Sequence, residues 1–216
     1  MTDDDLELRV AEELSWDPRA GSQAITVTAY DGVVTLAGTV DSVRQKRDAK
    51  KAAERVRGVV LVDDELDVRV PVEHRRDDAD LCRDVLQALA LDDQVPATVD
   101  AWVDDGFVTL VGTASWHHQR AEAEFVAASL RGVTGVDDAI ELVGLGPAAE
   151  NAGDSIKEAL RRHARIEADN IGVEIANGTA TLTGDVRSVW ERDMVIAAAW
   201  AAPGVRMVND RLDVFY

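Results

Sequence analysis

Residues 31–38 read Asp-Gly-Val-Val-Thr-Leu-Ala-Gly, and this stretch returns twice more along the chain. It returns as Asp-Gly-Phe-Val-Thr-Leu-Val-Gly at 105–112 and as Asn-Gly-Thr-Ala-Thr-Leu-Thr-Gly at 177–184. A further glycine follows each copy at the same spacing, at positions 58, 132 and 204. Such regular spacing of a repeated stretch indicates tandem structural repeats.

Each copy predicts its own local structure. Apolar and polar residues alternate before the turn, as at Ile25, Val27 and Ala29, which is typical of a half-buried strand. The Asp-Gly or Asn-Gly pair then predicts a tight hairpin, because glycine tolerates the positive φ that primed turns require. We expect the returning strand to end at the second glycine, Gly38 in the first copy, where a side chain would obstruct the turn into a helix.

Helices are predicted on both sides of each hairpin. Leu6, Val10 and Leu14 mark an amphipathic helix before the first hairpin, and a second helical pattern follows it, with a C′ glycine, Gly58, expected to end it. An alternating strand then closes the unit. The order αββαβ predicts an α+β fold of three tandem modules, each a three-stranded mixed sheet packed against two helices. The modules are placed at residues 1–70, 77–144 and 151–216.

The composition restricts the class of function. The chain has 216 residues, is 46% hydrophobic and carries a formal net charge of −18. Such an excess of acidic residues argues against a nucleic acid partner, because phosphate contacts dominate that affinity. The first residues contain no basic or long apolar segment, and the longest apolar run, 194–203, is too short to span a bilayer. We therefore expect no secretion signal, no transmembrane segment and a cytoplasmic location.

No enzyme motif is present in the sequence, whether a nucleotide-binding glycine loop, a zinc-protease motif or a pair of cysteines. We therefore expect a non-catalytic protein without a cofactor. Acidic residues do recur at the start of the last strand of every module, at Asp64, Asp138 and Asp210. Because hard cations prefer oxygen ligands, these residues support an alternative hypothesis, a sensor that binds potassium or calcium.

One segment departs from the acidic character of the chain. Between residues 44 and 57, seven basic residues are opposed by only two acidic ones, Asp48 and Glu54. A basic helix on an acidic body can orient a protein towards an anionic surface such as phospholipid, or bind an acidic protein face. The basic residues are Arg44, Lys46, Arg47, Lys50, Lys51, Arg55 and Arg57.

The equivalent helix of the third module is apolar on nearly every side, which is typical of a helix covered on two faces. Tryptophan often anchors protein interfaces, so self-assembly as a homo-oligomer through this helix is a second alternative. Packing against other modules of the same chain would also account for it. The candidate interface residues are Trp190, Met194, Ile196 and Trp200 of this helix, together with Trp116, which could line a comparable surface in the second module.

The repeated pattern resembles the BON domain, which bacterial osmotically induced proteins and nodulation proteins share. The resemblance rests on Asp/Asn-Gly-x-Val/Ala-Thr-Leu-x-Gly, a following helix, Gly-Val and an acidic or amide residue before the last strand, and it covers nearly the whole chain three times. It implies an αββαβ unit with two helices on a three-stranded sheet. It also implies binding, because family members bind ligands or surfaces, some of them anionic phospholipid. We therefore expect a stress-associated binding or scaffold protein.

Overall fold

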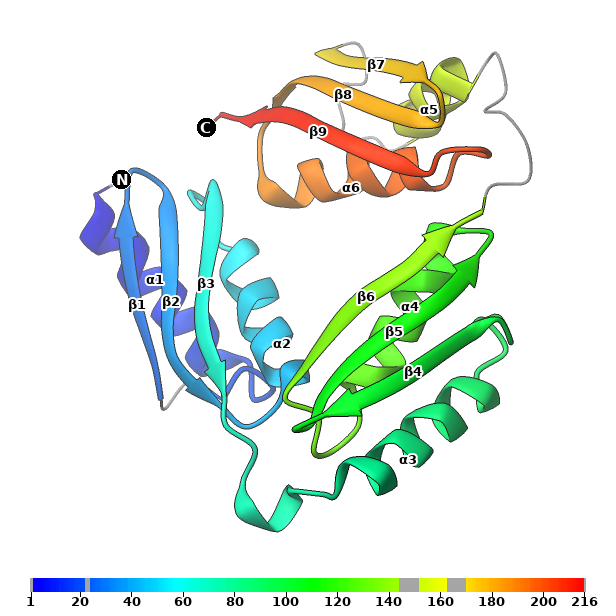
Figure 1. The fold of residues 1–216 in the computed structure, drawn as a ribbon. Coiled ribbons are helices and arrows are strands. Elements are labelled where there is room, and N and C mark those ends of the chain that lie inside the picture. The colour runs from blue at the N-terminus through cyan, green and yellow to red at the C-terminus, as the bar shows by residue number, and fades with distance from the viewer. Residues whose placement is uncertain (1, 22–23, 144–151, 163–169, 216) are drawn as a thin grey trace. The chain divides into compact units, whose positions relative to one another are not determined.

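The computed structural model describes residues 2–21, 24–143, 152–162 and 170–215. Over these residues the chain forms six α-helices and nine strands, which build three separate three-stranded sheets (Figure 1). Each sheet is mixed and belongs to an αββαβ module, which confirms the predicted α+β fold. The chain divides into two compact units, residues 1–114 with 119–141, and residues 115–118 with 142–216.

The elements repeat in the same order in each module. Module 1 contains α1 (Asp3–Trp16), β1 (Ile25–Tyr30), β2 (Val33–Val40), α2 (Val43–Glu54) and β3 (Leu61–Val68). Module 2 contains α3 (Asp78–Leu91), β4 (Val99–Asp104), β5 (Phe107–Ala114), α4 (His117–Ala128) and β6 (Gly135–Leu142). Module 3 contains α5 (Ala152–Arg161), β7 (Ile171–Ala176), β8 (Thr179–Val186), α6 (Val189–Trp200) and β9 (Met207–Val214). A short 3-10 helix, η2 (Val72–His74), lies between modules 1 and 2.

The second strand of each module is the centre of its sheet. In module 1, β2 pairs antiparallel with β1 and parallel with β3, so that Leu36 lies opposite both Val27 and Asp64. In module 3, β8 has the same two partners, β7 and β9. A parallel pair needs a crossover connection, and α2 and α6 provide it. The second sheet has the matching strand order, β4-β5-β6.

The predicted hairpin turns are present in all three modules. In the first, Asp31 and Gly32 both have positive φ, 49° and 81°. Asp105 and Asn177 adopt nearly the same left-handed φ, 47° and 51°, and a glycine follows each of them. Two successive residues with positive φ define the primed turn that matches the twist of paired strands.

The structure corrects the predicted roles of two other glycines. Gly38 does not end β2, which continues to Val40. Its φ is 131°, and a Cβ there would overlap the carbonyl oxygen of Ala24, so this position needs glycine because the backbone before β1 comes close. Gly58 does not cap α2 directly, because the helix ends at Glu54 and a turn separates the two.

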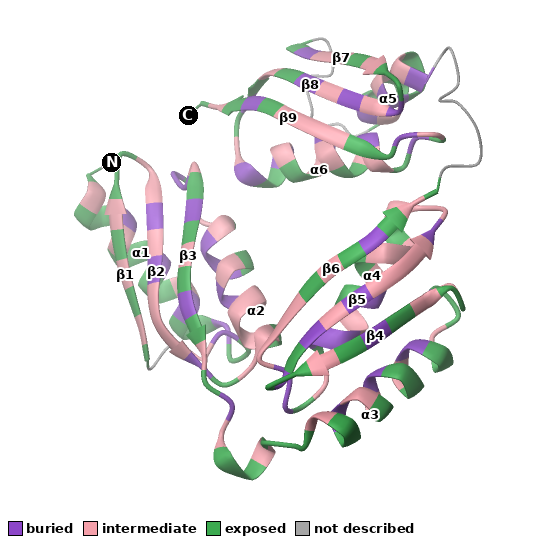
Figure 2. Cartoon of the chain, in the orientation of Figure 1, coloured by how far each residue is buried: buried purple, intermediate pink, exposed green. Residues whose placement is uncertain are grey.

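Each sheet is covered by helices on one face. In modules 1 and 3 the first helix packs against the first strand, the second helix against the third strand, and the two helices against each other. Leu36, Leu110 and Leu182, which occupy equivalent positions on the central strands, are all fully buried. Burial alternates along the strands (Figure 2), so the opposite face of each sheet carries the exposed residues.

Candidate functional site

The basic helix α2 begins at a serine cap and lies against its own module through small residues. The Ser42 side chain accepts a hydrogen bond from the Gln45 N–H, which satisfies one of the free donors at the helix start. Ala49, Ala52 and Ala53 are completely buried against the core. The long basic side chains therefore lie on the remaining faces of the helix.

Arg55 pairs with helix α1 of the same module. Its Nη2 lies 2.9 Å from Glu13 Oε1 and 3.0 Å from Asp17 Oδ2. Asp17 is buried, and it also accepts two side-chain hydrogen bonds from Arg19. The hydrogen bonds from Arg19, supported by Arg55, hold the pKa of Asp17 well below its ordinary value. Arg55 therefore joins two helices and is not a free surface cation.

Two further arginines of α2 contact an aromatic ring of module 2. The guanidinium carbon of Arg47 lies 4.5 Å from the centroid of the Phe125 ring, and that of Arg44 lies 5.9 Å from it. Both distances are in the range in which a cation is attracted to the face of a ring. This part of the predicted basic surface therefore contacts helix α4 within the same compact unit.

Three of the seven basic residues remain available for an external partner. Lys51 and Arg57 are exposed and Lys50 is partly exposed. None of the three makes an ion pair with any residue that the structure describes. Lys50 and Lys51 lie in the C-terminal half of α2 and Arg57 lies in the turn after it, and we call these three residues the α2 basic patch.

The repeated acidic residues of the last strands each face a basic residue of the preceding helix. Arg192 Nε lies 2.6 Å from Asp210 Oδ2, and the equivalent pairs are Arg120 with Asp138 at 2.8 Å and Lys46 with Asp64 at 3.5 Å. In each pair the carboxylate also accepts the backbone N–H two residues further along the strand, in Leu66, Ile140 and Leu212. This pairing was not predicted, although the three basic residues occupy equivalent positions of the repeat, as their acidic partners do.

These ion pairs engage the same three carboxylates that would be the ligands in the alternative hypothesis of a potassium or calcium sensor. Burial raises the pKa of Asp138, although the hydrogen bond from the Ile140 N–H and the charge of Arg120 oppose the shift. Among the described residues there is no group of three or more His, Cys, Asp or Glu side chains placed to hold a metal ion. The three acidic residues are thus placed as internal ion-pair partners.

The candidate interface residues differ in exposure. Trp190, on α6, is 45% exposed. Met194, Ile196 and Trp200 pack partly buried against the core of module 3. The Trp200 ring also stacks on His117, with centroids 4.0 Å apart and planes at 12°. Trp116 is partly buried, and its ring centroid lies 6.4 Å from that of His118.

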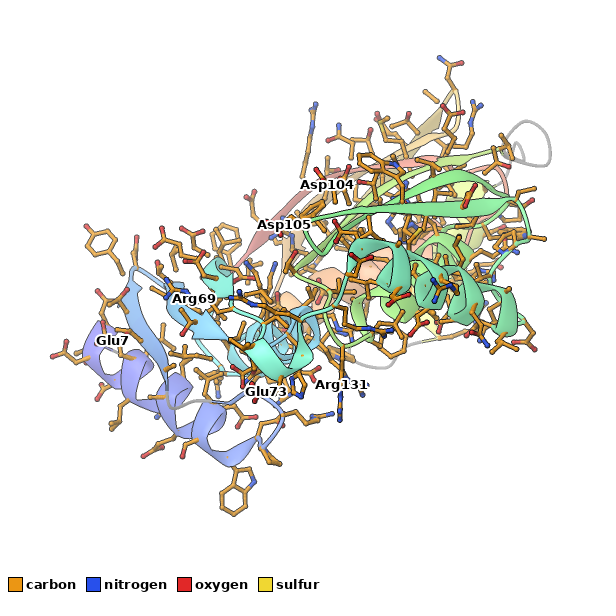
Figure 3. The ribbon with its side chains drawn as sticks, turned by 60° about the horizontal axis from the view of Figure 1, so that its bottom comes forward. Glu7, Arg69, Glu73, Asp104, Asp105 and Arg131 are labelled. Atoms are coloured by element: carbon orange, nitrogen blue, oxygen red, sulfur yellow. The ribbon has the colours of Figure 1, made fainter. Side chains whose placement is uncertain are left out.

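Sequence reasoning missed a cluster of arginines around η2. A cavity of about 330 Å³ in the first compact unit is lined by Arg69, Arg75 and Arg76 together with Asp78 and Asp105. Figure 3 labels Arg69, which lines the cavity, and Arg131, which precedes the lining residue Gly132; both arginines are exposed. The acidic lining residues counter the arginines, and both Asp78 carboxylate oxygens accept N–H groups of the β4–β5 turn. The cavity is thus lined by charges of both signs.

None of the helices in the described ranges combines the length and apolar character needed to cross a membrane. The fold and its internally repeated ion pair define a tandem protein of three small αββαβ modules. The family model of the BON domain matches residues 2–70, 77–144 and 149–214, so the chain belongs to the BON domain family. The resemblance read from the glycine pattern is thereby confirmed.

Two relatives are similar over most of their own length. Osmotically-inducible protein Y of Escherichia coli (strain K12) is 33% identical over 141 residues, which cover 63% of this chain and 70% of the relative. The 21 kDa hemolysin of Actinobacillus pleuropneumoniae is 30% identical over 147 residues, 66% of this chain and 74% of the relative.

Two solved structures with similarity to the chain are CdsD and PrgH, which are proteins of type III secretion systems. CdsD, a structural protein of that system in Chlamydia trachomatis, is 17% identical, with 98% of this chain and 92% of that chain covered and a TM-score of 0.27. The PrgH periplasmic domain is 11% identical, with 89% and 95% covered and a TM-score of 0.24. TM-scores this low support no statement about the function of this chain.

Proposed function

We propose that the protein is a non-catalytic, stress-associated binding protein that attaches to anionic phospholipid through module 1. The observation that carries the proposal is the α2 basic patch, Lys50, Lys51 and Arg57. It makes no ion pair with the described part of the chain, although the protein carries a net charge of −18. Membership of the BON domain family and the name of the osmotically inducible relative support the association with stress.

The charge distribution makes attachment directional. Module 2, residues 77–144, contains fourteen acidic and three basic residues, so an anionic surface repels it. The α2 basic patch is attracted to the same surface, and each Lys or Arg near an anionic membrane contributes about 1 kcal/mol. Three such residues therefore contribute about 3 kcal/mol, which is about a hundredfold in partitioning at low salt. The attraction weakens as salt screens the charges.

Vesicle flotation tests this proposal. The full chain is mixed with vesicles of phosphatidylglycerol and phosphatidylcholine, or of phosphatidylcholine alone, at low and at physiological salt. We expect flotation with the anionic vesicles only, weaker at the higher salt, and strongly reduced in the triple variant Lys50→Glu, Lys51→Glu, Arg57→Glu.

A matched control separates a specific patch from total charge. The variant Arg83→Glu, Lys157→Glu, Arg211→Glu changes the net charge by the same amount at positions on α3, α5 and β9. It should float as the unaltered chain does. Absence of flotation under every condition, or an equal loss in both triple variants, would overturn the proposal.

A further inference from the structure

The open face of the second sheet carries two exposed aromatic rings. Trp102 on β4 is 53% exposed and Phe107 on β5 is 45% exposed. Both belong to the outward set of their strands, because the residues that alternate with them, such as Ala101 and Val108, are buried. At the positions of Trp102 and Phe107, module 1 has a threonine and a valine, and module 3 has a glutamate and a threonine. The aromatic pair is therefore particular to module 2.

The neighbouring strand is adapted to the Phe107 ring. Gly135 begins β6, and a Cβ on this glycine would overlap the edge of the Phe107 ring. The equivalent residues of the other modules are Leu61 and Met207, whose side chains would occupy that space. The ring thus lies over the backbone of β6 and extends the apolar surface across two strands.

Acidic side chains surround these rings. Asp100 and Asp104 flank Trp102 on the same side of β4, and Asp137 and Glu141 are exposed acidic residues of β6 on that side. All four are exposed, and Figure 3 shows Asp104 at the end of β4, next to Asp105 in the turn. We call this surface, with Trp102, Phe107 and the four carboxylates, the acidic aromatic face. A surface of this kind can bind a cationic side chain, because the face of an aromatic ring attracts the cation and the neighbouring carboxylates pair with its charge.

We propose that the acidic aromatic face binds the α2 basic patch of a second copy of this chain. The two surfaces are complementary in charge, with four carboxylates on one and three cations on the other. The chain already uses this kind of contact internally, because Arg44 and Arg47 of α2 lie over Phe125 of module 2. The open face of a three-stranded sheet is also a suitable surface for a helix, since helices cover the other face of these sheets.

The proposed contact is heterologous, because each copy contributes a different surface. One copy presents its sheet and the other its helix end, so association proceeds head to tail and either closes into a ring or extends. The same basic patch serves the phospholipid proposal, and anionic vesicles therefore compete with this association. The acidic aromatic face takes no part in attachment to lipid, so the two proposals are separable.

Sedimentation velocity of the full chain over a range of concentrations tests the contact. We expect the mean mass to rise with concentration and to fall as salt is added. The variant Trp102→Thr, Phe107→Val introduces the residues of module 1 at exposed positions, so its circular dichroism should be unchanged. Because buried aromatic anchors carry much of the binding energy of an interface, its association should weaken at least about thirtyfold.

Mixing two charge-reversed variants tests which surfaces meet. Asp100→Lys, Asp104→Lys and Asp137→Lys together reverse the face, from a charge of −4 to +2, and Lys50→Glu with Lys51→Glu reverses the patch, from +3 to −1. Each variant alone should be monomeric, while a one-to-one mixture should form a heterodimer through the intact face of one and the intact patch of the other. The face variant should still float with anionic vesicles, which keeps a failure of this proposal distinct from a failure of the lipid proposal.

A monomeric unaltered chain at every concentration would overturn the inference. So would self-association that survives both reversals and is lost instead in Trp190→Ala, because the contact would then lie on α6. A mixture of the two charge variants that stays monomeric would show that the two surfaces do not meet.

Discussion

Removing the carboxylate of Asp210 should lower the stability of module 3 by more than a single polar substitution usually does. In Asp210→Ala the strand loses two hydrogen bonds, one from Arg192 Nε at 2.6 Å and one from the Leu212 N–H at 3.0 Å. The side chains of Arg192 and Asp210 are 30% and 19% exposed, so solvent compensates only part of the loss. The ion pair is then worth about 1.5 kcal/mol and the backbone N–H about 1 kcal/mol.

Hydrogen exchange of the full chain measures this loss directly. A destabilisation of about 2.5 kcal/mol corresponds to about seventyfold faster exchange of the protected amides of β9, if exchange proceeds through opening of the module. Asp213→Ala is the matched control, because it removes the same charge from the same strand at an outward position. It should change the exchange rate by less than about threefold.

A double-mutant cycle identifies the partner. Arg192→Met combined with Asp210→Ala should cost less than the two single changes together, by about 1 kcal/mol, because either change alone already breaks the pair. The same cycle for Lys46 and Asp64 should give a smaller coupling, since those atoms are 3.5 Å apart. The reasoning is refuted if Asp210→Ala exchanges like Asp213→Ala, or if the two losses simply add.

Three further predictions concern other contacts. Gly112→Ala should cost about 2 kcal/mol in urea unfolding, because φ there is 115°, whereas Gly153→Ala, inside α5, should be neutral or stabilising. Because its partners lower the pKa of Asp17, this carboxylate stabilises the fold above the ordinary pKa of aspartate and loses that effect in acid. The difference in thermal midpoint between the unaltered chain and Asp17→Asn should therefore shrink steadily below about pH 4. Phe125→Leu should lower the free energy of unfolding, measured in urea, by about 0.5–1 kcal/mol. In a chain that already carries Arg47→Met, the same change should lower it much less.

Most of the fold could be predicted because its determinants are local. The alternation of Ile25, Val27 and Ala29 and the Asp31-Gly32 turn depend on backbone preferences that a short stretch expresses by itself. Because the unit occurs three times, the sequence shows the pattern of each element three times. The predictions failed where a distant backbone decides the outcome: the sequence around Gly38 contains no sign that the Ala24 carbonyl lies against it.

The candidate site was less predictable, since charge counts do not show which charges are already used. Arg44 to Arg57 were treated as one basic surface, but Lys46 and Arg55 have partners in their own module and Arg47 lies on a ring of the next one. That ring belongs to Phe125, which is remote from Arg47 in the sequence, so no local pattern could indicate the contact. The equivalent placement of a basic residue in the second helix of every module was the one available signal of a structural role.

The parallel pairing of β2 with β3 has a consequence for how three similar modules avoid misfolding into one another. Val33 pairs with Leu61 of its own module, and the equivalent residue of module 2, Gly135, lies a whole repeat further along the chain. In every module the helix residue of the repeated ion pair is basic and the strand residue is acidic. The pair would therefore form equally well with the last strand of another module, and it does not select the correct strand. Closing the longer loop costs about 1 kcal/mol more, which favours the strand of the same module several-fold. Short connections within modules, more than residue identity, therefore keep the tandem chain from exchanging strands while it folds.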